Sequence, residues 1–296
     1  MSAVLVAAAL RWADPRARAH PLTGASEPAP YAAGAAAADG CALEHALQLA
    51  EAFGARCVAV TVGPAGAEEM LRDALAAGAD AVLRIEGDDG DEAATAHTLL
   101  AGLAAAGHPV PDLWVCGARS VDRGTGATPG HLAARQGVVQ ALGLLELTAA
   151  PAPAAEEGDG GAAGLRLRAV RRLDGGRAEE LQVPLPAVCS VEAGTLRPRR
   201  ASLAAALAAR RAEIPVVRVS APAGDAAGAV RAGRVRPYRP RAKALPAPEG
   251  STRQRLLTLT GALTPPRTPP RLVTPSSPEE AADLLLAHLR EHGVQG

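Results

Sequence analysis

The sequence from Gly117 to Gly137 reads GARSVDRGTGATPGHLAARQG. It follows a short apolar run, Leu113–Cys116, which is typical of a buried parallel strand. At the end of its glycine-rich part, Thr128 is suited to cap a helix and Pro129 to stand in that helix's first turn. The predicted order is therefore strand, glycine-rich loop and helix, and the rest of the chain is interpreted around it.

A helix that starts directly after a loop presents unpaired backbone N–H groups and the positive end of its dipole, which together suit a phosphate. Gly124 and Gly126 would let the chain approach a ligand closely, and the hydroxyls of Ser120, Thr125 and Thr128 would add donors. An ordinary crossover, in which the glycines only form the turn, stays open because short glycine motifs are not specific. No Gly-Lys-Ser/Thr follows, so the loop is not a Walker A loop.

Two charged residues of the loop, Asp122 and Arg119, each allow two interpretations. Asp122 would bond a ribose hydroxyl or serve as a plain turn residue, and Arg119 would offset phosphate charge or lie in solvent. No constellation elsewhere indicates catalysis, because the seven histidines show no HExxH spacing and Ser120 is not in a GxSxG elbow. The four cysteines lack a CxxC pair and are expected to be buried thiols, so we predict neither a metal nor a catalytic residue.

Composition narrows the class of protein. The 296 residues allow one large domain, or one domain with an extension, and hydrophobic residues at 48% suffice for a core of small side chains. A formal net charge of +0 and only 2% aromatic residues argue against nucleic-acid binding. No apolar run of about 18 residues occurs, and the start of the sequence lacks a basic signal region. We therefore expect a cytoplasmic protein that does not insert into a membrane.

Strands alternate with helices in the first half of the chain, which predicts an α/β fold with a mostly parallel nucleotide-binding sheet flanked by helices. The predicted strands are Val4–Ala9, Cys57–Val62, Ala81–Ile85 and Leu113–Cys116. The predicted helices are Cys41–Phe53, one that ends at Gly78, and one that Asp91 caps and that ends near Gly107, whereas residues 16–40 are expected to form a loop. In such sheets ligands bind beyond the carboxyl ends of the strands, where the strand order reverses.

The second half differs in pattern. Leu165–Val170 and Glu179–Val183 alternate like an antiparallel hairpin around Asp174–Gly176, and Ala187–Val191 is a further strand. An Ala-rich helix is expected to end at Arg211, and a final helix to begin at Pro278. Between them lies an extended Pro-rich arm with six basic residues from Arg231 to Lys243, either a solvated linker or a strap along a partner. We divide the chain into a domain at 1–213 and an arm with a terminal helix at 214–296, which would pack on a partner subunit.

Several segments match a known family in order. The opening LVAAALRWAD, the stretch CVAVTVGPAGAEEMLRDALAAGADAVLRI, the Asp174-Gly175-Gly176 turn and Leu185-Pro186-Ala187-Val188 all resemble the β subunit of electron transfer flavoproteins. The Pro-rich C-terminal part is similar to an actinobacterial branch associated with the redox peptide mycofactocin. The resemblance implies a structural AMP in this subunit and FAD held mainly by an α subunit. It places the AMP contacts at Ala8, Asp39, Val62, Gly117, Ala118, Arg119, Ser120, Val121, Asp122, Gly124, Thr125, Gly126, Ala127 and Thr128.

Two family segments are altered in this chain. An Asn-Pro-Phe-Cys-Glu turn is replaced by Ala36–Gly40, and an acidic Asp-Asp-Asp-Cys-Asn segment by Asp122–Gly126. The family's recognition loop aligns with Val191–Glu213, where Leu203 is the implied docking residue, with Arg199 and Arg200 before it. Packing within a helix is the other reading of Leu203.

The resemblance implies half of a heterodimeric electron carrier. It would accept electrons from flavin-dependent dehydrogenases and pass them to a membrane quinone oxidoreductase, without catalysis by its own side chains. The alternative is a stand-alone adenine-nucleotide-binding module of the universal-stress type, which would form homodimers without flavin. An ATP-pyrophosphatase is a third reading, but its Ser-Gly-Gly-x-Asp-Ser loop is absent near the first strand.

Overall fold

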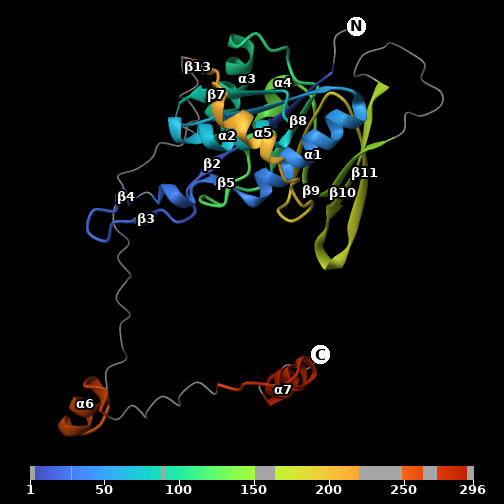
Figure 1. The fold of residues 1–296 in the computed structure, drawn as a ribbon. Coiled ribbons are helices and arrows are strands. Elements are labelled where there is room, and N and C mark those ends of the chain that lie inside the picture. Colours follow the sequence, from blue (N-terminus) through green and yellow to red (C-terminus); the bar gives the residue numbers. More distant parts are fainter. Residues whose placement is uncertain are drawn as a thin grey trace. The chain divides into compact units, whose positions relative to one another are not determined.

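The computed structural model describes residues 4–27, 29–87, 91–150, 164–219, 249–262 and 272–291, and the chain divides into two compact units, 1–238 and 239–296. Within the described residues, the first unit contains a nine-stranded sheet in the order β11-β10-β9-β12-β8-β1-β6-β7-β13 (Figure 1). Its strands are β1 Leu5–Ala9, β6 Arg56–Val62, β7 Ala81–Glu86, β8 Leu113–Gly117, β9 Val139–Ala150, β10 Arg166–Arg172, β11 Ala178–Pro184, β12 Ala187–Val191 and β13 Val216–Arg218. Two small antiparallel pairs join β2 (Trp12–Ala13) to β5 (Gly34–Ala35) and β3 (Arg18–Ala19) to β4 (Ser26–Glu27).

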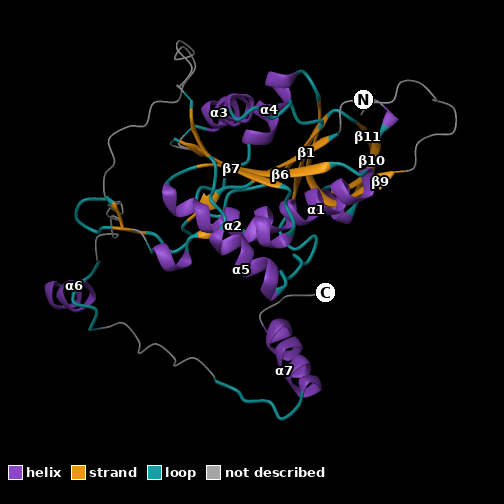
Figure 2. Cartoon of the chain, turned by 45° about the horizontal axis from the view of Figure 1, so that its top comes forward, coloured by secondary structure: helices purple, strands orange, loops and turns teal. Residues whose placement is uncertain are grey.

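Helices cover both faces of this sheet. Figure 2 shows α3 (Glu92–Ala105) and α4 (Thr128–Gln136) on one face, and α1 (Ala37–Phe53), α2 (Glu68–Ala77) and α5 (Leu203–Arg211) on the other. The second unit contains α6 (Thr252–Leu259) and α7 (Pro278–Glu291), neither of which buries a side chain among the residues described.

Most of the sheet is parallel, which confirms the predicted fold class. β1 pairs in parallel with both β6 and β8, and β12 pairs in parallel with β8 and β9. Within the nine-stranded sheet, antiparallel pairing is confined to β9, β10 and β11, and the β10–β11 turn at Asp174–Gly176 confirms the predicted hairpin. The chain winds outward from β1 through β6 and β7 and then returns to β8 on the other side of β1.

The central strand divides the core into two layers. Val6 and Ala8 of β1 belong to the cluster that packs under α1 and α2. Leu5 and Ala7 point to the opposite face and join the cluster under α3 and α4. All four are buried, as expected for a parallel strand that is covered on both faces.

The structure corrects three sequence predictions. Helix α1 begins at Ala37 and not at Cys41, so the expected loop at 16–40 ends earlier and contains three short strands, β3, β4 and β5. Residues 252–259, for which no helix was predicted, form helix α6 with a Ser251 capping box. The 12-residue strand β9 was missed altogether, because its buried residues are Ala141, Leu144 and Leu147, a spacing of three. Register shifts against both neighbouring strands break the alternation that identifies a strand.

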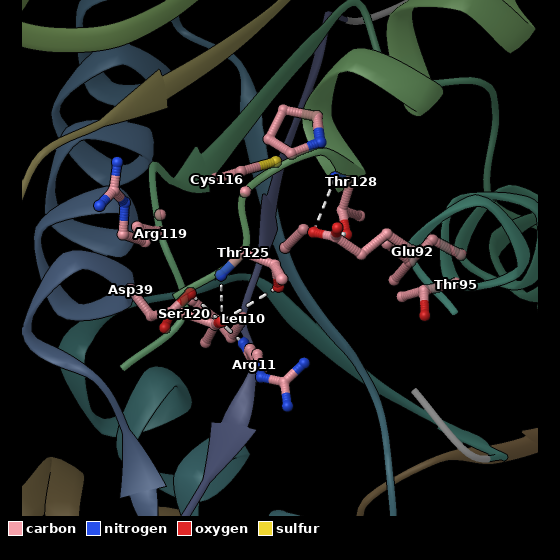
Figure 3. Close-up of a pocket in the computed structure, with 15 residues that line it drawn as sticks. Leu10, Arg11, Asp39, Glu92, Thr95, Cys116, Arg119, Ser120, Thr125 and Thr128 are labelled. Atoms are coloured by element: carbon pink, nitrogen blue, oxygen red, sulfur yellow. Dashed lines mark hydrogen bonds between the residues drawn. The ribbon is translucent and has the colours of Figure 1, made fainter. Parts of the chain in front are cut away.

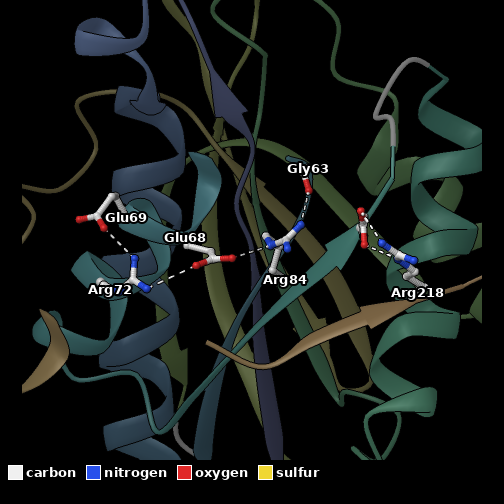
Figure 4. Close-up of polar contacts among 7 residues, drawn as sticks. Gly63, Glu68, Glu69, Arg72, Arg84 and Arg218 are labelled. Atoms are coloured by element: carbon white, nitrogen blue, oxygen red, sulfur yellow. Dashed lines mark hydrogen bonds and ion pairs between the residues drawn. The ribbon is translucent and has the colours of Figure 1, made fainter. Parts of the chain in front are cut away.

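A chain of ion pairs connects α2 to the sheet (Figure 4). Arg84 of β7 is buried, and its guanidinium donates to Glu68 at 3.1 Å and to the Gly63 carbonyl at 3.2 Å. Arg72 extends the chain from Glu68 to Glu69 along the helix surface. A buried guanidinium needs such partners, because leaving one unpaired would be strongly destabilising.

Some predictions fall outside the described residues. One of these is the basic part of the arm, Arg231–Lys243. The predicted domain boundary at residues 213 and 214 and the packing of the C-terminal part on a partner stay predictions.

Close packing of α3 on the sheet gives a stability test. A Cβ at Gly102 would lie 2.2 Å from Cδ1 and 2.6 Å from Cγ1 of Ile85, which is fully buried and β-branched and cannot turn away. We expect Gly102→Ala to lower the free energy of unfolding, because overpacking costs about 1–3 kcal/mol and outweighs the ~1 kcal/mol that alanine gains over glycine in a helix. Urea unfolding measures the change. Gly34→Ala is the control, since nothing lies within 4 Å of its added Cβ. An unchanged Gly102→Ala midpoint would contradict this packing.

Candidate functional site

A cleft lies at the carboxyl ends of β1 and β8, the two strands between which the winding direction reverses. Figure 3 shows the residues that line it, which come from β1, β8, the first turns of α1 and α3, and the loop before α4. Switch points of parallel sheets are the usual place for ligands, because two neighbouring loops leave the sheet there in opposite directions.

Half of the residues predicted to contact AMP line this cleft: Asp39, Gly117, Arg119, Ser120, Thr125, Gly126 and Thr128. Val121 and Asp122 line a neighbouring cleft beside Gly63 and Gly87. Ala8 and Val62 are buried within β1 and β6 and do not line it, and neither do Ala118, Gly124 and Ala127.

The loop between β8 and α4 closes on itself. The Ser120 backbone N–H donates to the Thr125 carbonyl at 2.8 Å, and the Gly124 N–H donates to the Ser120 carbonyl at 3.0 Å, with Gly124 at a φ of 68°. The hydroxyls of Ser120 and Thr125 lie 3.2 Å apart and bond each other. Gly126 packs against the loop's own backbone, since a Cβ there would lie 2.1 Å from the Ala118 carbonyl oxygen. These glycines therefore shape the loop itself.

Helix α4 begins one residue earlier than predicted. Thr128 is its first residue and not its cap, and Ala127, in the cap position, offers no side-chain hydrogen bond. Glu92 of α3 supplies the missing acceptor. Its Oε1 lies 2.8 Å from the Ala127 nitrogen, 3.3 Å from the Thr128 nitrogen and 3.5 Å from the Thr128 hydroxyl. The predicted Asp91 cap of α3 is confirmed, since its Oδ1 accepts the Ala93 N–H at 3.0 Å.

Asp39 lies in the first turn of α1 on the opposite wall, with 5% of its surface exposed. Its Oδ1 accepts the backbone N–H of Arg11 at 3.4 Å, and a Cβ at Gly117 would lie 3.0 Å from it. Burial raises the pKa of Asp39 from 3.8 to about 7, although the N–H and charge of Arg11 act against this. The Arg11 side chain donates to Asp122 at 2.8 Å, which ties the end of β1 to the loop.

The predicted docking segment between β12 and α5 is held by one face of α1. The Cys41 thiol donates to the Leu196 carbonyl at 3.2 Å. His45, one turn further along α1, bonds the Leu147 carbonyl at 3.1 Å and the Thr195 hydroxyl at 3.2 Å. Burial lowers the pKa of His45, which favours the neutral ring.

Glu44 lies between those two residues on α1 and anchors Arg199. The buried Glu44 carboxylate accepts the Arg199 backbone N–H at 3.0 Å and its side-chain Nε at 3.0 Å, and Glu51 pairs with the same guanidinium. Ser202 caps α5, and Leu203, the next residue, is 77% exposed. Arg200 is also exposed. Arg199 therefore positions the segment, while Leu203 projects from it.

The sequence interpretation missed several cleft residues, Leu10, Arg11, Glu92, Thr95, Leu99, Cys116 and Pro129 among them. Arg11 had a usable signal, because it follows a buried strand whose carboxyl end was expected at the ligand edge.

Within the described residues, no group of three or more His, Cys, Asp or Glu side chains could hold a metal. No helix in the part of the chain that the structure describes is long and apolar enough to cross a bilayer.

The buried Asp39 carboxyl predicts a pH effect on stability. In the folded state the Asp39 carboxyl keeps its proton up to about pH 7, whereas in the unfolded chain it loses the proton near pH 3.8. The free energy of unfolding should therefore fall as pH rises through this window and then level off. Asp39→Asn stays neutral throughout. We expect its free energy of unfolding, relative to the natural chain, to be higher at pH 8 than at pH 5, as measured by urea unfolding. Asp174→Asn, in the exposed β10–β11 turn, is the control, and equal pH profiles for all three proteins would contradict the assignment.

Comparison with known proteins identifies the family. A family model described as the electron transfer flavoprotein domain matches residues 31–222. The FixA protein of Azorhizobium caulinodans is 32% identical over 180 residues, which cover 59% of this chain and 60% of that protein. The electron transfer flavoprotein subunit beta of Methylophilus methylotrophus is 30% identical over 169 residues, 56% of this chain and 59% of that subunit.

The matched part spans about 60% of the length of these relatives. The residues matched by the family model include the glycine-rich loop of the cleft, the hairpin strands and the segment that leads into α5. Because the domain model covers well over half of the sequence, the chain belongs to the electron transfer flavoprotein family and is a protein of the β-subunit type.

Proposed function

We propose that this chain is the β subunit of a heterodimeric electron transfer flavoprotein, which takes electrons from flavin-dependent dehydrogenases and delivers them to a membrane quinone oxidoreductase. The observation that carries the proposal is the presentation of Leu203. An exposed leucine on a capped helix, with its approach held by Arg199 and the buried Glu44, is built for contact with another protein. Leu207, four residues further along the same helix face, is also exposed, so the two leucines form an apolar surface and not a single exposed side chain.

FAD would be held mainly by an α subunit and supplies the redox chemistry when bound. The side chains of this subunit would orient the partner and exclude water at the contact. No acid–base constellation is needed for such a carrier, because electron transfer requires close approach of the two redox centres and no proton relay from this chain.

AMP, which the family resemblance implies for the cleft, does not fit the donors that the cleft offers. A phosphate would need the backbone N–H groups at the start of α4. Those of Ala127 and Thr128 already donate to the Glu92 carboxylate. The hydroxyls of Ser120 and Thr125 share one hydrogen bond, which takes up one of their two O–H donors.

Co-expression tests the carrier function. Produced together with an α-type subunit of the same family, the full chain should yield a yellow one-to-one heterodimer with the absorption spectrum of oxidised flavin. Size-exclusion chromatography with absorbance detection measures both properties. A colourless homodimer would favour the stand-alone nucleotide-binding module instead and would contradict the proposal.

Leu203→Ala tests the docking role. Burial of a leucine in a partner pocket contributes about 1.5–3 kcal/mol, so we expect electron transfer from the dehydrogenase to lose about tenfold or more in kcat/KM. Flavin content should be unchanged. Leu22→Ala is the matched control, since Leu22 is 81% exposed but lies between β3 and β4. Equal losses for the two variants, or none for Leu203→Ala, would remove Leu203 from the contact.

A further inference from the structure

The start of helix α4 needs an acceptor that its own sequence does not supply. The first N–H groups of any helix have no partner within the helix. Ala127 makes no side-chain cap, and the first turn of α4 contains no acidic residue. The acceptor must therefore come from another part of the chain or from a bound anion.

Glu92 meets this need for two of the backbone N–H groups, those of Ala127 and Thr128. One carboxylate oxygen accepts from two backbone N–H groups and lies within reach of the Thr128 hydroxyl, as Figure 3 shows for Glu92 and Thr128. Glu92 is free for this role because Asp91, and not Glu92, caps α3. The negative charge lies at the positive end of the α4 dipole, which is the arrangement that a phosphate adopts at such a site.

We propose that Glu92 is the specificity-determining residue of this cleft: its carboxylate takes the place of a nucleotide phosphate, so that the chain folds and works without bound AMP. The inference rests on the proposed function, because AMP is expected in this cleft only if the chain is the β subunit of such a heterodimer. A second anion at the same N–H groups would find its donors occupied and would be repelled by the charge that occupies them.

Besides Glu92, the charged side chains that line the cleft are Asp39, Arg11 and Arg119. Asp39 adds a second carboxyl group on the opposite wall. The Arg11 guanidinium pairs with Asp122. Figure 3 shows Arg119 on the opposite side of the cleft from Glu92 and Thr128.

The test uses the purified full chain and two probes, AMP and adenosine, which differ only in the phosphate. Mass spectrometry of the denatured natural chain should find no stoichiometric AMP. Calorimetry should give AMP no tighter binding than adenosine. Glu92→Thr removes the charge and leaves room and a hydroxyl for a phosphate, so AMP affinity should rise at least tenfold while adenosine affinity changes less.

Controls separate the role of Glu92 from general effects. Glu92→Gln removes the charge but keeps an acceptor for the two N–H groups, so it provides a folded variant if Glu92→Thr is unstable. It should also bind AMP more tightly than the natural chain. Glu69→Ala removes an exposed carboxylate of α2 and should change nothing. Stoichiometric AMP in the natural chain, or equal AMP affinity in the natural chain and a folded Glu92 variant, would overturn the proposal. Flavin binding is measured separately, on the complex with an α subunit. If the carrier function fails, the AMP and adenosine affinities can still be interpreted.

Discussion

The reversal of winding at β1 is the constraint on which the molecule depends. Because β1 is covered on both faces, each of its side chains must fit one of two core layers, and small residues such as Ala7 and Ala8 let the helices approach closely. The loops that follow β1 and β8 then diverge around a cleft that the topology creates without help from any ligand. The cleft's existence is a consequence of the fold, whereas its chemistry depends on the few side chains that enter it.

Those side chains make the cleft self-contained. Glu92 joins two helices that the sequence separates, and Arg11 joins the end of β1 to the loop before α4 through Asp122. The hydroxyls of that loop also bond within it. In other glycine-rich loops a bound ligand supplies hydrogen-bond partners for the loop. Here the protein's own side chains and backbone supply them, which agrees with a protein whose function lies at its surface.

The sequence predicted the parallel half of the fold well, because apolar strands and glycine-capped helices alternate there without interruption. The prediction failed where pairing with neighbouring strands, and not the local pattern of apolar residues, decides the structure. β9 shows buried residues at a spacing of three, since a bulge and Gly143 reset its register, and no local rule reads that as a strand. The site was predicted through its loop, but Glu92 was not, because a glutamate after a cap residue is ordinary and only the tertiary contact between α3 and α4 reveals its acceptor role.

The anchoring of the segment before α5 has a consequence for how such carriers diversify. Its position depends on Glu44 and on the Ser202 cap, which bracket the residues between them. Arg200 and Ala201 make no contact of comparable strength and are exposed. Mutations there would change the exposed surface of the segment without a penalty in folding, so this surface can vary one substitution at a time on an unchanged scaffold.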